Sequence, residues 1–172
     1  VSIDFVPADP DTGIVFVRPD VPGEPVELRA LASEVGGTDL STILGDPAGV
    51  HVGTVEHLLA ALAGLGIDNL LIEIDGNEVP VLDGSAAPFV DAFEQAGLQQ
   101  QAVKRRYIRI LKPVRIESGA SWAEFRPYSG TRFEVDIDFE SPAIGRQSFA
   151  TDITPDLFRD ELERARTFGF MK

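Results

Sequence analysis

Residues 54–93, TVEHLLAALAGLGIDNLLIEIDGNEVPVLDGSAAPFVDAF, decide the fold class of this chain. The stretch opens with apolar residues at helical spacing: Val55, Leu58, Leu59, Leu62 and Leu65. This spacing predicts an amphipathic helix, for which Thr54 is a suitable N-cap and Gly64 and Gly66 mark the end. The apolar residues 69–74 then predict a strand, so a helix leads directly into a strand.

The second half of the same stretch predicts a strand, a loop and another helix. Residues 79–82 have the pattern of a short strand. In the loop DGSAAP, Asp83 or Ser85 is the expected N-cap of the helix that follows. Pro88 suits the first turn of this helix, and Gly97 closes it.

Shorter patterns on both sides predict further strands and one more helix. Alternating or apolar runs predict strands at 1–5, 14–17, 26–30, 107–116, 122–125 and 132–139. Thr154 followed by Pro155 predicts the start of a final helix. Strands followed by helices, twice over, indicate an α+β architecture.

Composition divides the chain into two domains. We expect a first α+β domain at 1–97, a linker at 98–105 and a partial second α+β domain at 106–172. Val1 stands where a strand pattern is already under way, and the last residues stop without a terminating signal. We therefore expect a fragment that lacks the opening strand of the first domain and the end of the second.

Composition also excludes several classes of function. The 172 residues are 44% hydrophobic and 25% charged, which favours a packed core over disorder. The absence of cysteine excludes disulfides, thiolate catalysis and cysteine-ligated metals. A net charge of −13 disfavours binding to nucleic acid. No apolar run approaches the roughly 20 residues of a membrane span, and no signal peptide opens the chain, so we expect a cytoplasmic protein without stable membrane insertion.

Glu56 and His57 stand together in the first turn of the first predicted helix. Zinc hydrolases of the H-E-x-x-H type place a metal-binding His beside a Glu that takes a proton from the metal-bound water. Here the order is Glu-His, and Ala60 and Ala61 lie one turn later, so a second ligand is not on this helix. The alternative is that Glu56 stabilises the helix dipole and His57 is an ordinary hydrogen-bonded residue. The other histidine, His51, has the pattern of a surface residue at a strand edge.

A basic cluster opens the second half of the chain. Six cations and no acidic residue lie between Lys104 and Arg115. In an acidic protein such a cluster suits a phosphate or pyrophosphate group. A solvated strand face is the alternative interpretation.

Four motifs in order resemble one family of enzymes. The stretch 54–93 closely resembles the signature segment of the UDP-3-O-acyl-N-acetylglucosamine deacetylases, which are zinc hydrolases of lipid A biosynthesis. WAEFRPY at 122–128, DFESPAIGRQ at 138–147 and RARTFGFM at 164–171 match the same family in the same order. The resemblance covers nearly the whole chain.

This resemblance implies a fold and a chemistry. It implies two similar α+β domains that face each other, with the active site between them. It also implies a Zn²⁺ cofactor and a UDP-linked, acylated glucosamine as substrate, from which acetate is released. In that reaction His57 matches a zinc ligand, Glu56 the general base, and Thr167 the threonine whose hydroxyl helps to stabilise the oxyanion.

Further positions match residues near the substrate in that family. They are Leu40 in the loop beside the metal site, Phe168 and Phe170 near the sugar and the mouth of the acyl-chain passage, and Arg115, Asp138 and Phe139 near the nucleotide. Family members often carry Lys where this chain has Ser121, so one cation expected near the pyrophosphate is missing here.

The resemblance places the rest of the catalytic machinery beyond Lys172. It implies two further zinc ligands, a His and an Asp, and a general-acid His in that region. A catalytic zinc takes three protein ligands and a water, so we expect this chain by itself to be inactive and the complete protein to be the enzyme. The alternative is a family-derived module without catalysis that binds a ligand or a partner.

Overall fold

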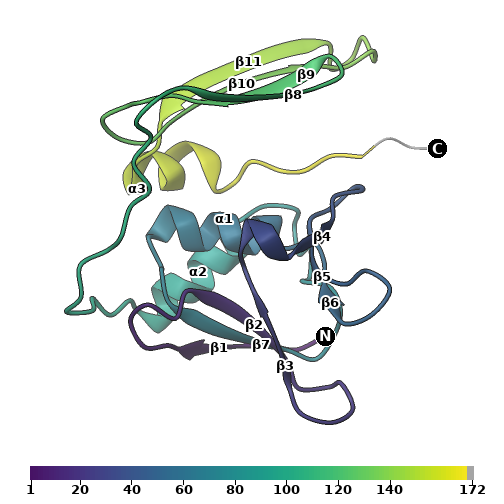
Figure 1. Ribbon diagram of the computed structural model, residues 1–172, viewed down its shortest axis with the longest axis vertical. Coiled ribbons are helices and arrows are strands. Elements are labelled where there is room, and N and C mark those ends of the chain that lie inside the picture. The colour runs from purple at the N-terminus through teal and green to yellow at the C-terminus, as the bar shows by residue number, and fades with distance from the viewer. Residues whose placement is uncertain (170–172) are drawn as a thin grey trace. The chain divides into compact units, whose positions relative to one another are not determined.

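The computed structural model describes residues 1–169, which form two compact units (Figure 1). The first unit contains Val1–Lys104 and the segment from Phe158 onward, and the second contains Arg105–Leu157. The combination of several small sheets with helices confirms the expected α+β class. The domain boundaries drawn from composition stay a prediction.

The first unit is built on a four-stranded sheet with the order β1-β7-β2-β3. Its strands are β1 (Ile3–Pro7), β2 (Ile14–Arg18), β3 (Val26–Arg29) and β7 (Leu70–Ile74). Ile72 at the centre of β7 lies opposite Phe5 in the antiparallel pair with β1 and opposite Phe16 in the parallel pair with β2. A parallel pair requires a crossover connection, and the chain between β2 and β7 supplies it.

Two helices, α1 (Glu56–Leu65) and α2 (Ala87–Ala96), pack together over one face of this sheet (Figure 1). The core beneath them includes fully buried apolar side chains from both layers: Phe16, Leu58, Leu62, Ile72, Ile74 and Val90. Each side chain of this size contributes about 1.5–3 kcal/mol by leaving water. The helical periodicity of the signature stretch therefore correctly predicted which face is buried.

A second, three-stranded sheet leads into α1. It consists of β4 (Val35–Gly37), β5 (Ile43–Gly45) and β6 (His51–Val52), and all its pairs are antiparallel. A 3-10 turn, η1 (Ala32–Glu34), precedes it. Strands of two or three residues are too short to show an alternating pattern, so the sequence predicted only the strand edge at His51.

The start of α1 differs from the prediction that Thr54 caps it. Val55 holds the N-cap position and makes no side-chain cap. Thr54 has a φ of 55°, and its hydroxyl donates to Glu78 Oε1 at 2.7 Å. A side chain that caps a helix accepts a hydrogen bond from an N–H of the first turn, whereas the Thr54 side chain is directed to Glu78. The end of α1 agrees with prediction, because Gly66 closes it with a φ of 73°.

Residues 79–82 do not form the predicted strand. Val79 is buried, and its N–H donates to the carbonyl of Gly53 at 3.0 Å, but no regular ladder follows. Pro80 has no N–H to donate, and Leu82 turns the chain with a φ of 53°. The apolar pattern at this position therefore reflects burial in a loop.

The start of α2 agrees with prediction in part. Ala86 holds the N-cap position without a side-chain cap, while the Ser85 hydroxyl accepts a hydrogen bond from the N–H of Ala87 at 3.2 Å. Pro88 lies in the first turn and Gly97 ends the helix, as expected. Ser85, the residue before the N-cap, thus stabilises the start of the helix.

The second unit consists of two antiparallel hairpins. One joins β8 (Val114–Ser118) to β9 (Ser121–Phe125), and the other joins β10 (Arg132–Asp138) to β11 (Arg146–Asp152). None of the residues of Arg105–Leu157 is buried. Each hairpin therefore leaves its apolar face exposed, for example Ile116 at 70% and Phe133 at 55%.

One strand prediction in this unit requires correction, and one strand was missed. The strand predicted at 107–116 begins only at Val114, because Pro113 removes a backbone donor immediately before it. Strand β11 was not predicted, since RQSFATD lacks alternation. It forms through pairing with β10, where Val135 lies opposite Phe149.

The predicted final helix is short. Thr154 Oγ1 accepts a hydrogen bond from the N–H of Leu157 at 3.1 Å, so Thr154 caps the helix at the predicted start. The chain then forms one turn, α3 (Pro155–Leu157), and a π-helical turn, η2 (Phe158–Leu162). Buried Phe158 packs on Gly64 of α1, where a Cβ would lie 2.2 Å from the ring. Among the described residues, no helix is both long enough and apolar enough to cross a membrane.

Candidate active site

Glu56 and His57 begin α1, where the chain leaves β6. The backbone N–H of Thr42, from the loop before β5, donates to Glu56 Oε1. The Glu56 side chain stays exposed, so this bond orients the carboxylate without removing it from water. An oriented carboxylate in the first turn suits a general base, and it also stabilises the positive end of the helix.

His57 has a nitrogen that lacks a partner. Its Nδ1 atom is buried, and it makes no hydrogen bond with any described residue. Leaving such a polar atom unsatisfied costs about 1–3 kcal/mol. The alternative interpretation of His57 as an ordinary hydrogen-bonded residue requires a partner for Nδ1 that the described residues do not supply. A neutral imidazole nitrogen that is not engaged by another residue is compatible with metal ligation.

The residues present fit one position of a zinc site. Within residues 1–169, no three His, Cys, Asp or Glu side chains gather in an arrangement that could hold a metal ion. A catalytic zinc takes three protein ligands. His57 can therefore supply one of them, and the described part of the chain does not complete the set.

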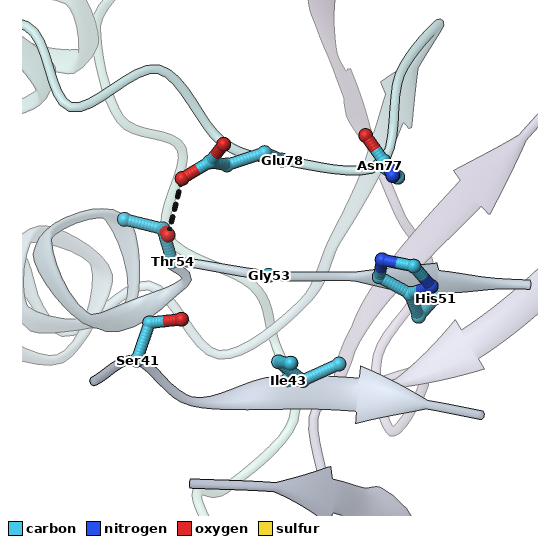
Figure 2. A pocket seen from close by; sticks show the side chains of 7 residues that line it. All are labelled: Ser41, Ile43, His51, Gly53, Thr54, Asn77 and Glu78. Atoms are coloured by element: carbon cyan, nitrogen blue, oxygen red, sulfur yellow. Dashed lines mark hydrogen bonds between the residues drawn. The ribbon is translucent and has the colours of Figure 1, made fainter. Parts of the chain in front are cut away.

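A polar pocket of about 200 Å³ lies beside the start of α1 (Figure 2). It is lined by Ser41, Ile43, His51, Gly53, Thr54, Asn77 and Glu78. Figure 2 shows the Thr54–Glu78 hydrogen bond and the His51 ring on this lining. Sequence reasoning placed His51 at the surface and did not single out Ser41, Asn77 or Glu78.

Pairing between distant segments creates this pocket. The N–H of Gly53 donates to the carbonyl of Asn77 at 2.9 Å, and the N–H of Val79 donates back to Gly53 at 3.0 Å. These bonds fix the backbone three residues before Glu56. No local motif predicts this contact, because it is an isolated bridge between Gly53 and Glu78, which lie far apart in the sequence.

Thr167 lies beside the loop that precedes α2. Its N–H donates to the carbonyl of Gly84 at 3.0 Å, and Arg166 Nη2 lies 3.3 Å from Asp83 Oδ2. Hydrogen bonds from Ser85 hold the pKa of the Asp83 carboxyl below its ordinary value, and the charge of Arg166 acts in the same direction. The structure thus places Thr167 in the same unit as Glu56 and His57, while its oxyanion role stays a prediction.

The other predicted substrate residues of the first unit are exposed. Leu40 is 100% exposed with a φ of 63°, two residues before the Thr42 amide that holds Glu56. Phe168 is also exposed. Phe170 lies outside the described residues. Apolar side chains at the surface suit contact with a substrate, but the structure does not test these roles.

The three predicted nucleotide-binding residues belong to the second unit. Arg115 on β8 stacks over the Trp122 ring at 4.1 Å and pairs with Glu117 at 2.7 Å. Asp138 ends β10, and the N–H of Phe139 donates to the carbonyl of Gly145 at 3.1 Å. Arg115 is thus held by its own hairpin, and the nucleotide role of all three stays a prediction.

Comparison with known proteins identifies the family. The family model for UDP-3-O-acyl N-acetylglycosamine deacetylase matches residues 1–172. The chain belongs to this family. Two relatives, the UDP-3-O-acyl-N-acetylglucosamine deacetylases of Brucella ovis and Brucella canis, are each 56% identical to it over 171 residues. The match covers 99% of this chain and 59% of each relative, so the chain spans about 59% of the length of these deacetylases.

Proposed function

We propose that the complete protein is a zinc-dependent deacetylase. It hydrolyses the acetamide of UDP-3-O-acyl-N-acetylglucosamine and releases acetate, as a step of lipid A biosynthesis. Membership of the deacetylase family supports this proposal. The observation that carries it is the Glu56–His57 pair, in which an oriented carboxylate neighbours an imidazole nitrogen without a partner.

His57 has the role of one zinc ligand in this proposal. Its half-buried ring presents a nitrogen with no hydrogen bond to give up on binding. Zinc at such a site supplies a water whose pKa is lowered toward about 7. In this proposal the remaining ligands are supplied by residues other than those of the described part of the chain, where no group of three such side chains gathers.

Glu56 accepts the proton of the attacking water. One of its oxygens, Oε1, accepts the hydrogen bond from the Thr42 amide, which leaves Oε2 for the water. A positioned carboxylate of this kind contributes roughly 10²–10⁴-fold to the rate. The exposure of Glu56 fits this role, since a proton acceptor has to be accessible to the water and the substrate.

Thr167 stabilises the negative charge on the substrate oxygen. Its N–H donates to the carbonyl of Gly84, which fixes the backbone from which the side-chain hydroxyl would donate. Loss of one oxyanion donor costs about 2.7–4 kcal/mol in comparable enzymes. The exposed ring of Phe168 next to it offers an apolar surface for the sugar.

The net charge of −13 supports the prediction that nucleic acid is not a partner.

The test is Glu56→Gln in the complete protein. Gln keeps an oxygen for the Thr42 amide and cannot act as a base. We expect the zinc content to stay near one equivalent while kcat falls by roughly 10²–10⁴. Metal analysis and acetate release on the same preparation measure both quantities.

Two further variants make the test decisive. His57→Ala removes a ligand, so zinc content and turnover should fall together. Glu73→Gln changes an exposed Glu on β7 and serves as the matched control, with both quantities unchanged. Near-normal turnover in Glu56→Gln would refute the assignment of the base, and full zinc retention in His57→Ala would refute that of the ligand.

A further inference from the structure

The loop DGS at 83–85 makes hydrogen bonds both to the start of α2 and to a segment far along the chain. Asp83 Oδ1 accepts hydrogen bonds from the N–H of Ser85 at 3.0 Å and from its hydroxyl at 2.7 Å. The same hydroxyl accepts the N–H of Ala87, so the fully buried Ser85 ties Asp83 to the start of α2. These bonds use Oδ1 of Asp83 and leave Oδ2 for another partner.

The same loop contacts the segment that carries Thr167. Asp83 Oδ2 pairs with Arg166, and the carbonyl of Gly84 accepts the N–H of Thr167. Two consecutive loop residues thus bind two consecutive residues that lie 83 positions later in the chain. At the other end of this segment, Phe158 packs on Gly64. The segment 158–168 is therefore anchored to the first unit at both ends.

We propose that Asp83 is a positioning residue for the reaction, which fastens Arg166 and thereby fixes the hydroxyl of Thr167. This inference rests on the proposed oxyanion role of Thr167. The ion pair is partly exposed, with the side chains of Asp83 and Arg166 at 41% and 68%, and such pairs contribute little to overall stability. The effect of the Asp83–Arg166 pair is therefore local: it determines the position of Thr167, the residue after Arg166.

The first experiment measures the anchor without measuring activity. Asp83→Asn keeps an oxygen for Ser85 and loses the charge that holds Arg166. In the 172-residue chain, we expect the amide of Thr167 to exchange with deuterium about two- to fivefold faster, as expected for loss of a surface ion pair. The buried amide of Ile72 should be unaffected and reports that the fold is intact.

Two controls separate this anchor from general loosening. Arg166→Gln should have the same effect as Asp83→Asn, and the double variant should add nothing, because the two side chains act as one pair. Glu94→Gln removes the ion pair of Glu94 with Arg159, at 2.8 Å, between α2 and the same segment. It should leave the exchange of Thr167 unchanged. An unchanged Thr167 amide in Asp83→Asn, or an equal increase in Glu94→Gln, would overturn the proposal.

The second experiment uses the complete protein. Asp83→Asn should lower kcat, with KM and zinc content unchanged, by less than the roughly 10²–10³-fold expected for loss of an oxyanion donor. In a Thr167→Ala background it should have no further effect, because the group that it positions is gone. An equal loss of kcat in both backgrounds would refute the positioning role. If the wild-type protein has no deacetylase activity, the proposed function fails, and the exchange measurements still decide whether Asp83 anchors the segment.

Discussion

At the scale of single residues, buried Arg18 links strand β2 to the strand that precedes α1. Its side chain is only 9% exposed, and it bonds through Nε and Nη2 to the two carboxylate oxygens of Asp20 at 2.8 Å. Its Nη1 donates to the carbonyl of His51 at 2.5 Å, which joins β2 to the strand that leads into α1. A buried guanidinium needs its counter-charge, so Asp20 is required for this link.

We predict that Asp20→Asn destabilises the first unit at neutral pH. The hydrogen bond from Arg18 lowers the pKa of the Asp20 carboxyl. The stabilisation is therefore complete above the ordinary carboxyl pKa and is lost as the pH falls through the lowered one. Urea unfolding should show a lower midpoint for Asp20→Asn at about pH 7, and the difference should shrink below about pH 4. Exposed Asp39→Asn is the control, and a difference that does not vary with pH would contradict this explanation.

At the scale of secondary-structure elements, α1 carries both the core and the site. Leu58 and Leu62 are buried on one side of the helix, while its first turn presents Glu56 and His57. Packing of the apolar side thus determines where these two functional side chains lie. The same helix supplies Gly64, on which Phe158 rests.

Leu62→Ala should cost about 2–5 kcal/mol of unfolding free energy, the usual cost of such a cavity in a packed core. Leu62 is 1% exposed, so its loss leaves a space that its neighbours cannot fill completely. The matched control is Leu98→Ala beyond α2, at a side chain that is 52% exposed, where the cost should stay within about 0.5 kcal/mol. Similar costs for both variants in urea unfolding would mean that this face of α1 is not packed as described.

The elements that could be predicted are those that are determined by residues close together in the sequence. Apolar periodicity with Gly66 correctly indicated α1, and Pro88 with Gly97 correctly indicated α2, because a helix makes its hydrogen bonds within a few residues. Strands β4, β5 and β11 were missed, since each depends on a partner elsewhere in the chain. These strands form because they pair with other strands, and strands as short as β4 and β5 show little alternation of apolar and polar residues.

The candidate site shows the same limit. Glu56 and His57 are neighbours in the sequence, so their pairing could be predicted from chemistry. The contact of Thr42 with Glu56 and that of Thr54 with Glu78 could not, because loops from two sheets bring those residues together. Thr54 was expected to cap a helix, and only the structure shows that its backbone turns the hydroxyl toward Glu78.

At the scale of the whole molecule, the two units differ in how they are stabilised. The first has a continuous apolar core around Phe16 and Ile72, whereas the second consists of two hairpins with no buried residue. A two-stranded hairpin by itself is marginally stable in water. The stability of the 172-residue chain should therefore lie almost entirely in the first unit.

Hydrogen exchange of the 172-residue chain tests this division. The amide of Ile72 in β7 exchanges only when the core opens, while that of Val135 in β10 is protected by its hairpin alone. Because core opening costs several kcal/mol and hairpin opening very little, we expect Ile72 to be protected on the order of 10³-fold more strongly than Val135. Leu62→Ala should reduce the protection of Ile72 and leave that of Val135 unchanged, since the second unit does not depend on that core. Equal protection at both positions would show that the hairpins fold cooperatively with the first unit.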